Sequence, residues 1–157
     1  MTSWDERYRT GDYPTRAEPT DALVRFVDAF PAGRALDVAT GTGRNALFLA
    51  EEGYDVHAVD RSEEGLEIAR ERAAERGLEI EFERADVTEY GFPEGAYDVI
   101  TVTHFRTLDA LADLKAALAP GGVLFYQHHL RSSEPTDRGP SDRHRFASNE
   151  LLRACLD

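Results

Sequence analysis

The sequence predicts an α/β fold with a doubly wound, mostly parallel sheet of about five strands in the order 3-2-1-4-5. Short apolar, β-branched runs alternate along the chain with stretches of about 10 to 15 residues that show helical periodicity. Such alternation is typical of βαβ units, whose right-handed crossovers cover both faces of a parallel sheet. A chain of 157 residues has room for one buried core but not for two. We therefore expect residues 1–157 to form a single domain.

Local patterns place the individual elements within a core of residues 20–130. Helical spacing of apolar residues predicts helices over residues 20–30, 45–52, 63–76 and 108–118. Apolar or alternating runs predict strands over residues 35–38, 56–59, 78–83, 97–103 and 123–127. Ser62 is expected to cap the third helix, and Pro120-Gly121-Gly122 to end the fourth. Residues 131–157 are predicted to form a polar loop and a short terminal helix capped by Ser148.

The chain is strongly acidic, with 30 Asp and Glu against 18 Lys and Arg and a net charge of -12. Such a surface repels phosphate backbones and anionic lipid, so we expect neither nucleic acid nor membrane as a partner. Acid-rich composition with Lys115 as the single lysine resembles that of halophilic proteins, in which salt screens self-repulsion. The lone Cys155 and the polar start of the chain predict a cytoplasmic protein without disulfides.

Three carboxylates are expected at the ends of the first three strands, on Asp37, Asp60 and Asp86. In open parallel sheets, ligands bind outside the carboxyl ends of the strands, where the strand order reverses. Between the first two carboxylates lies Gly41-Thr42-Gly43, in which the glycines let the backbone turn tightly and approach a ligand. Asp60 follows this turn at close to the spacing of about 20 residues at which an acid reaches a ribose hydroxyl. The sequence therefore predicts a nucleoside-like ligand at this edge.

Two kinds of ligand fit the glycine turn. Gly41-x-Gly43-x-x-Ala46 is also a permitted dinucleotide fingerprint, so a nicotinamide oxidoreductase is one alternative. A pyrophosphate, however, is an anion that neighbouring carboxylates repel, and it needs backbone N–H groups at a helix N-terminus instead. Asp37 instead suits a cationic group such as the amino group or sulfonium of S-adenosylmethionine (SAM), and Asp86 suits an adenine amino group.

The stretch ALDVATGTGRNALFLA, residues 35–50, together with four further segments, resembles the Rossmann-like class I SAM-dependent methyltransferases. The further segments are Ala58-Val59-Asp60, Ala85-Asp86-Val87, Tyr97-Asp98-Val99-Ile100 and Leu118-Ala119-Pro120-Gly121-Gly122-Val123-Leu124. Residues 41–46 and Trp4-Asp5-Glu6-Arg7-Tyr8 resemble the tellurite-resistance and thiol-methyltransferase-like branch of that class. The resemblance implies SAM as cofactor and methyl transfer to a small soluble acceptor, such as a thiol, a metalloid oxyanion or another small metabolite.

The resemblance also assigns roles to residues. It implies that the loop containing Asp37, Ala39, Thr40, Gly41 and Gly43 holds the methionine part of SAM, that Asp60 binds the ribose diol, and that Asp86 and Val87 contact adenine. Asn45, Arg61 and Thr103 complete the expected cofactor set, and Arg44 and Asn45 are placed to position SAM or a small anionic acceptor. Ala39 stands where many members have glycine. Residues 1–19, with Trp4, Tyr8 and Tyr13, are expected to precede the first helix and to fold over the site as a lid.

Methyl transfer mainly requires alignment of the two reactants and exclusion of water. Where the acceptor must lose a proton, a histidine is a natural base near neutral pH. His104 and His128 follow the fourth and fifth strands, so we expect them at the acceptor pocket, although both could simply end strands. His57 is expected to pack in the core. No metal site is expected, because adjacent residues such as His128 and His129 point to opposite sides of an extended segment.

Several alternatives stay open at this point. The sixth and seventh strands common in this class have no counterpart in the pattern, which predicts either a homodimer through the incomplete sheet edge or a truncated, inactive domain. A SAM-binding module without catalysis is the second functional reading. Methylation of nucleic acid is disfavoured by the charge and because Thr103-His104-Phe105 stands where a base-flipping Asn-Pro-Pro-Tyr motif would be.

Overall fold

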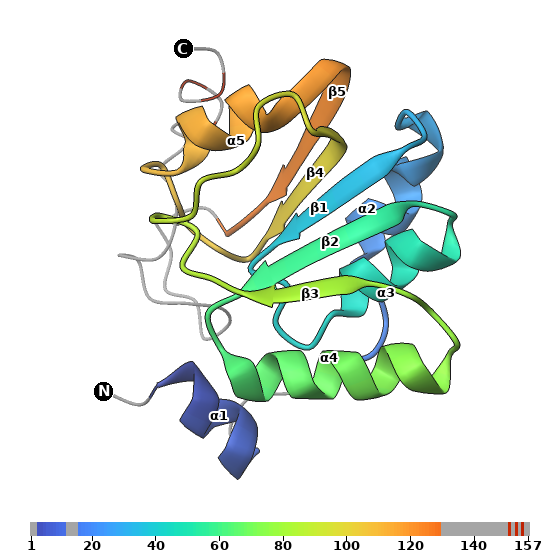
Figure 1. Cartoon of the computed structure of the whole chain (residues 1–157), viewed down its shortest axis with the longest axis vertical. Coiled ribbons are helices and arrows are strands. Elements are labelled where there is room, and N and C mark those ends of the chain that lie inside the picture. Colours follow the sequence, from blue (N-terminus) through green and yellow to red (C-terminus); the bar gives the residue numbers. More distant parts are fainter. Residues whose placement is uncertain (1–2, 12–15, 130–150, 152, 154, 156–157) are drawn as a thin grey trace, which may run out of the picture.

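The computed structural model describes residues 3–11, 16–129, 151, 153 and 155 (Figure 1). Within these residues, five parallel strands form one sheet in the order β3-β2-β1-β4-β5, which confirms the predicted fold class and strand order. The strands are β1 (Arg34–Val38), β2 (Asp55–Asp60), β3 (Glu81–Arg84), β4 (Tyr97–Thr103) and β5 (Leu118–Gln127). The helices are α1 (Trp4–Thr10), α2 (Asp21–Phe26), α3 (Arg44–Glu51), α4 (Glu63–Glu75) and α5 (Leu111–Ala117), with a 3-10 turn η1 (Val27–Ala29).

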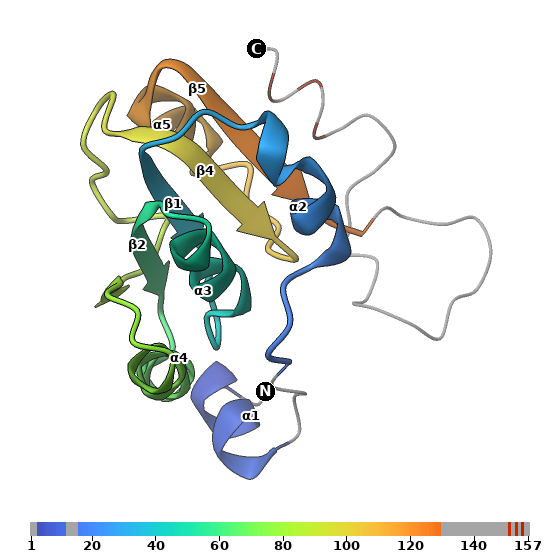
Figure 2. The ribbon, with the colours of Figure 1, turned by 90° about the vertical axis from the view of Figure 1, so that its right-hand side faces the viewer.

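Helices cover both faces of the sheet, so the molecule has three layers (Figure 2). On one face, Leu36 and Ile100 of the sheet pack with Leu114 of α5. On the other face, Leu23 of α2 and Leu49 of α3 pack against the sheet. All five of these side chains are fully buried. This burial on both faces is the reason that the strand sequences are almost continuously apolar.

The start of α4 follows the sequence prediction. The Ser62 hydroxyl accepts a hydrogen bond from the Gly65 N–H at 3.2 Å and thereby caps the helix. Glu63 and Glu64 occupy the first turn, where negative charge suits the helix dipole. One apolar face of the helix is buried through Leu66, Ala69 and Ala73.

Helix α1 was not expected, because residues 1–19 were predicted to precede the first helix. Its seven residues contain no buried side chain, and the two aromatic residues spaced four apart, Trp4 and Tyr8, are too few to show a clear apolar periodicity. A capping box starts the helix: Ser3 accepts from the Glu6 N–H, and Glu6 accepts from the Ser3 N–H, both at 3.2 Å. Gly11, with φ of 76°, ends it in the left-handed conformation. The Ser-x-x-Glu spacing, the stop at Gly11 and the four-residue spacing of Trp4 and Tyr8 were the local signals for this helix.

Further boundaries differ from the prediction: the strand expected over residues 78–83 is β3 (Glu81–Arg84), and the helix expected over residues 108–118 is α5 (Leu111–Ala117). The helix expected over residues 20–30 is a short α2 followed by η1. Strand β5 was expected to begin after Pro120-Gly121-Gly122 but begins at Leu118, which pairs with Tyr97. The register then shifts before Val99 pairs with Val123, so the proline and glycines lie inside an irregular strand. Proline is tolerated there because β5 is the outer strand of the described sheet.

The sheet register brings the carboxyl ends of the strands to one edge. Asp37 of β1 lies beside Ala58 of β2 on one side and Thr101 of β4 on the other. The chain builds the sheet outward from β1 first in one direction, to β2 and β3, and then in the other, to β4 and β5, so the strand order reverses at β1. The predicted loop over residues 131–147 and the Ser148 cap lie outside the described residues. Leu151, Arg153 and Cys155, the described residues of the expected terminal helix, are helical. No helix in the described part of the chain is both long and apolar enough to cross a membrane.

Candidate functional site: the carboxyl ends of the strands

The turn between β1 and α3 is built from left-handed residues. Ala39, Gly41 and Gly43 have φ angles of 56°, 60° and 83°. The Thr40 N–H donates to the Val59 carbonyl oxygen at 2.9 Å and so ties the turn to β2. A Cβ atom at Gly43 would lie 2.8 Å from the Cβ of Ala69 in α4. Glycine is therefore required at position 43 both for its conformation and for the close approach of α4.

Asp37 is a buried carboxylate behind this turn, with only 2% of its surface exposed. One oxygen accepts a hydrogen bond from the Thr40 hydroxyl and the other from the Thr101 hydroxyl, both at 2.7 Å. Burial raises the pKa of Asp37 to about 6, although the two threonine hydrogen bonds act in the opposite direction. Asp37 therefore fixes the turn through Thr40 and places a carboxylate behind it, and its expected role toward a cationic ligand stays a prediction.

Asp60 joins the turn to the start of α4. One of its oxygens accepts from the Gly41 N–H and the other from the Ser62 N–H, both at 2.8 Å. Burial raises the pKa of Asp60 from its usual value, and these two hydrogen bonds oppose the rise. Each carboxylate oxygen can accept more than one hydrogen bond, so capacity remains for a pair of ribose hydroxyls.

Asp86 and Val87 follow β3 and differ in their surroundings. Asp86 is exposed, and the Thr88 hydroxyl and N–H donate to it at 2.7 and 3.0 Å. The Thr88 hydroxyl is the main cause of the lowered pKa of Asp86. The Val87 side chain packs in the core with Leu36. Arg61, after β2, is exposed.

Asn45 connects three segments around the site. Its amide oxygen accepts from the Thr20 N–H at 2.9 Å, and its amide nitrogen donates to the Thr103 hydroxyl at 3.2 Å. Only 3% of Asn45 is exposed. Asn45 and Thr103, both expected to touch the cofactor, therefore hold the start of α2, the first turn of α3 and the end of β4 in fixed relation.

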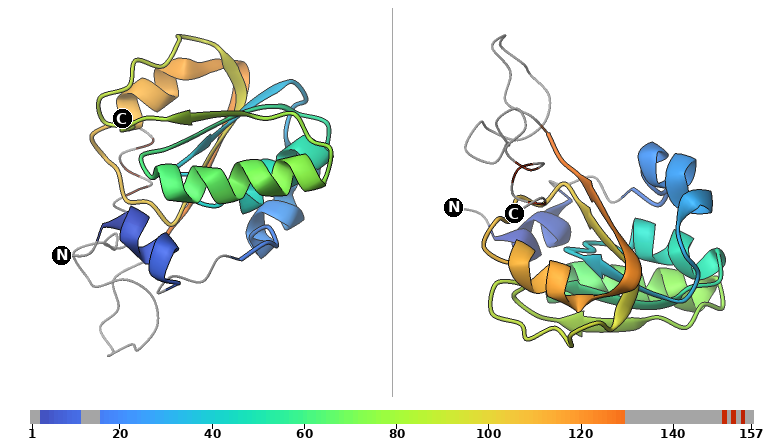
Figure 3. Two further views of the ribbon diagram at one scale, coloured as in Figure 1. Left: turned by 60° about the horizontal axis from the view of Figure 1, so that its bottom comes forward. Right: turned by 90° about the horizontal axis from the view of Figure 1, so that it is seen from above.

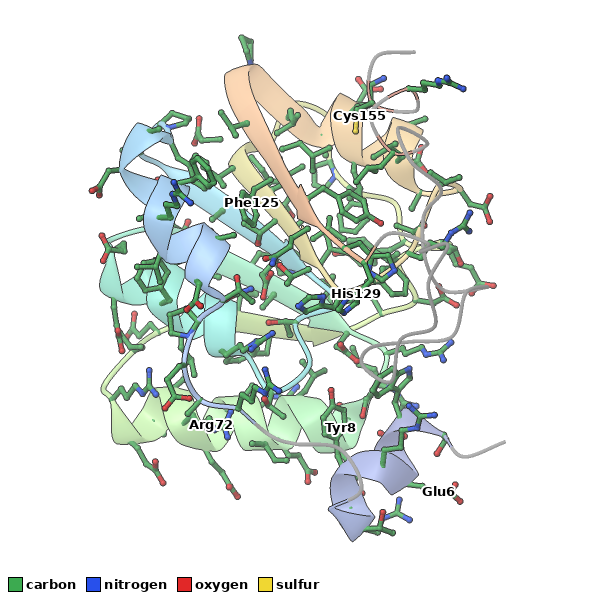
Figure 4. The ribbon with its side chains drawn as sticks, turned by 180° about the vertical axis from the view of Figure 1, so that it is seen from behind. Glu6, Tyr8, Arg72, Phe125, His129 and Cys155 are labelled. Carbon is green, nitrogen blue, oxygen red and sulfur yellow. The ribbon has the colours of Figure 1, made fainter. Side chains whose placement is uncertain are left out.

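Imidazole rings gather beyond β4 and β5. The rings of His104 and His129 stack with centroids 4.8 Å apart, and the rings of His128 and His129 are 5.8 Å apart in an edge arrangement. Figure 4 shows His129 beyond the end of β5, on the side where the strands terminate. The His104 N–H donates to the Gln127 carbonyl oxygen at 2.8 Å, which fixes its backbone at φ of 56°. The sequence singled out His104 and His128, and the structure adds His129.

His104 lies in a cationic environment. Its pKa is lowered to about 4, first by partial burial of the ring and then by His129, Arg44, His128 and Arg16. The ring is therefore neutral at pH 7 and can accept a proton, but it is a weak base in this state. A bound anion would offset the neighbouring positive charges and raise this pKa.

His57 is a core residue, as the sequence indicated, with 3% of its surface exposed. Its ring nitrogens lie 2.7 Å from the Tyr97 hydroxyl and 3.1 Å from a Glu83 oxygen. These partners satisfy the buried ring without any ligand.

Within the described residues, neither a metal site nor the groove between α4 and β3 is part of the candidate site. No group of three His, Cys, Asp or Glu side chains in the described ranges is arranged to hold a metal ion. An open groove runs between α4 and β3, lined in part by Arg70, Ile80 and Phe82. It reaches Asp55 at the amino end of β2, so it lies at the opposite end of the sheet from the carboxylates.

Comparison with known proteins places the chain in a class. Residues 35–122 match a family described as "Methyltransferase domain". The chain is 45% identical over 98 residues to the demethylmenaquinone methyltransferase of Thermus thermophilus, covering 58% of this chain and 44% of that protein. It is 34% identical over 136 residues to the glycine/sarcosine N-methyltransferase of Parasynechococcus marenigrum, covering 80% of this chain and 47% of that protein. It thus spans about half the length of these curated relatives.

A solved structure agrees with this placement. TehB from Haemophilus influenzae superposes with a TM-score of 0.75 at 26% identity, covering 98% of this chain and 55% of that one. The chain belongs to the class I SAM-dependent methyltransferases, as the sequence motifs implied. The match to TehB fits the tellurite-resistance branch loosely. Membership in this class favours the SAM interpretation of the glycine turn over the dinucleotide one.

We expect SAM affinity to fall in acid because Asp37 must be ionised to favour the sulfonium. With a pKa of about 6, Asp37 is mostly ionised at pH 7 and mostly protonated at pH 5. The dissociation constant for SAM should therefore rise about tenfold from pH 7 to pH 5, measured by calorimetry. Asp37→Asn should bind more weakly at pH 7 and lose most of this dependence. A flat profile for the unmodified protein would contradict the role given to Asp37.

Proposed function

We propose that this protein transfers the methyl group of SAM to a small soluble acceptor. The observation that carries the proposal is the link between the glycine turn and the acid after β2: Asp60 accepts the Gly41 N–H at 2.8 Å. This link holds a carboxylate beside a turn that a ligand can approach closely. When bound, SAM would supply a methyl group already activated by its sulfonium, so the chain's task is to align the reactants and exclude water.

The roles of the residues follow from their surroundings. Asp60 would bind the ribose diol with its remaining acceptor capacity, and Asp86 with the Val87 backbone would contact adenine. The turn from Asp37 to Gly43, including Ala39 and Thr40, would hold the methionine part. Arg61 lies exposed beside the ribose position. Asn45 and Thr103 would act by fixing the walls of the site.

We also propose that the acceptor is an anion. In a protein with a net charge of -12, the groups named as acting on His104 are basic side chains, Arg16, Arg44, His128 and His129, and the two arginines among them are charged at pH 7. Such a local excess of positive charge attracts a carboxylate or oxyanion and disfavours a cation. Among the acceptors that the sequence suggests, metalloid oxyanions and thiolates fit this environment, as do small carboxylates.

A SAM-binding module without catalysis is the second candidate. The observation that favours it is the pKa of about 4 for His104, which makes that ring a weak base without an anion nearby. Turnover measurements with an anionic acceptor distinguish the two candidates. Cytoplasmic location, adaptation to salt and the absence of nucleic-acid partners stay predictions from composition.

Cofactor binding is the first test. Calorimetric titration at high salt, which screens the acidic surface, should give micromolar affinity for SAM and S-adenosylhomocysteine and none for NAD. Asp60→Ala should raise the dissociation constants of both adenosyl ligands at least about tenfold, because it removes the carboxylate that would accept hydrogen bonds from the ribose. Asp28→Ala, an exposed aspartate on η1, is the matched control and should bind normally. Binding of NAD but not SAM by the folded protein would reject the proposal.

Steady-state kinetics test the acceptor site, starting with thiols and metalloid oxyanions. Replacing His104 or His128 with alanine should lower kcat at least about tenfold if that ring takes the acceptor proton. Arg44→Gln should instead raise the KM of an anionic acceptor about tenfold, because one neighbouring charge is lost. A loss below tenfold for both histidines rejects the base role. An unchanged KM for Arg44→Gln rejects the anionic acceptor.

The outer strand β5 supports a proposal about assembly. It is an edge of the described sheet, and Val24 and Phe26 of α2 are 47% and 50% exposed. An exposed strand edge invites pairing with another chain, so we propose a homodimer through β5. Light scattering should give twice the monomer mass if two β5 edges pair. A monomer at high protein concentration would contradict this assembly.

A further inference from the structure

A chain of hydrogen bonds joins α1 to the start of α4. One oxygen of Asp5 accepts from the Ser62 hydroxyl at 2.6 Å and from the Glu64 N–H at 3.2 Å. These two bonds, the Ser62 hydroxyl first, hold the pKa of Asp5 below its usual value. The carboxylate also lies at the N-terminus of a 13-residue helix, where negative charge is favoured. Asp5 thus anchors α1 on the start of α4, together with an exposed ion pair between Arg9 and Glu64 at 3.4 Å.

Ser62 continues this chain to the ligand carboxylate. Its hydroxyl donates to Asp5 and accepts from the Gly65 N–H at 3.2 Å, while its own N–H donates to Asp60 at 2.8 Å. The other oxygen of Asp60 accepts from the Gly41 N–H. The path therefore runs from Asp5 through Ser62 and Asp60 to the glycine turn. A shift of Ser62 would move its own N–H, which is one of the two donors that fix the Asp60 carboxylate.

Tyr8 provides a second contact between α1 and the same turn. A Cβ atom at Gly41 would lie 2.8 Å from the Tyr8 hydroxyl, and one at Gly65 would lie 2.9 Å from Cε2 of Tyr8. The absence of side chains at these two glycines thus lets the tyrosine lie against the backbone. Figure 3 shows α1 lying beside the first turns of α4, and Figure 4 shows Tyr8 between the two helices.

Helix α1 depends on these contacts for its position. It has seven residues, none of them buried, and its contacts with other helices and strands are mainly with α4. A helix of that length is not stable alone in water, so docking and helix formation are coupled. The free energy that separates docked from undocked α1 is therefore small enough for a ligand to change.

We infer that Asp5 is a positioning residue for Asp60, acting through Ser62, and that docking of α1 is coupled to cofactor binding. This inference rests on the proposed function for its cofactor. A ligand that binds Asp60 and the glycine turn stabilises the docked helix, and by reciprocity the docked helix strengthens the binding of that ligand. Since Tyr8 lies against Gly41, undocking also loosens the turn and speeds release of the cofactor.

Hydrogen exchange of the protein without ligand tests the positioning role directly. Asp5→Ala should accelerate exchange of the Ser62 and Gly41 amides about tenfold, because both donate to Asp60. Asp5→Asn keeps an acceptor oxygen and should restore most of the protection. Asp28→Ala is the charge-matched control and should exchange like the unmodified protein. Unchanged exchange at both amides in Asp5→Ala would overturn the positioning role.

Stopped-flow release of SAM tests the coupling. Asp5→Ala should raise the dissociation rate about tenfold and should abolish the ligand-induced protection of α1, while the melting temperature changes little. An unchanged dissociation rate, despite faster amide exchange, would overturn the coupling. Failure of the unmodified protein to bind SAM would overturn the proposed function instead, and the exchange result would still decide whether Asp5 positions Asp60.

Discussion

The carboxylate of Asp37 lies inside the sheet where the strand order reverses, and its burial constrains everything built around it. A buried charge is costly unless hydrogen bonds compensate for the lost water. Here the compensation comes from Thr101 on the neighbouring strand and from Thr40 in the turn that follows β1. The same two bonds that solvate the carboxylate therefore fix the turn relative to β4. The turn cannot change its path without leaving Asp37 unsatisfied.

From this point the site extends outward through backbone donors. The Thr40 N–H bonds to β2, and the next N–H, that of Gly41, bonds to Asp60. Asp60 in turn accepts from Ser62 at the start of α4. Each step places a carboxylate or a turn through hydrogen bonds to the backbone, which tolerate little displacement. A ligand bound at Asp60 is consequently coupled to the sheet on one side and to α1 on the other.

Sequence reasoning recovered what depends on local pattern. The parallel sheet, the Ser62 cap and the burial of His57 follow from periodicity and residue type, as does the strand-end position of the carboxylates, whereas the strand order followed from the Rossmann-like fold class that the motifs resemble. It missed α1 because that helix is short and buries no side chain, with only Trp4 and Tyr8 on its apolar side. It misplaced the start of β5 because Pro120 and the glycines are normally strand breakers. The bond between Asp5 and Ser62 joins residues 57 positions apart, and no local spacing indicates it.

For the site residues too, local sequence pattern indicated position along the chain, whereas burial and contacts between distant residues required the structure. Sequence placed Asp37, Asp60 and Asp86 together at one edge, but only the structure separates a buried carboxylate from a half-buried one and an exposed one. Thr101 carried a weak signal, as a hydroxyl within an apolar strand. His129 was placed with His128 just past the fifth strand, but its stacking on His104 depends on the path of the chain after β5.

The charge distribution connects the acidic surface with the site. Most of the 30 acidic residues act through solvent, where salt shortens the range of their field to about 8–10 Å at physiological ionic strength and further above it. Asp37 and Asp60 are buried or half-buried, so salt screens their interactions far less. High salt therefore relieves repulsion across the surface while leaving the field of these two carboxylates within the site nearly intact. A protein can thus carry a large negative charge for solubility without tying its cofactor affinity to that surface.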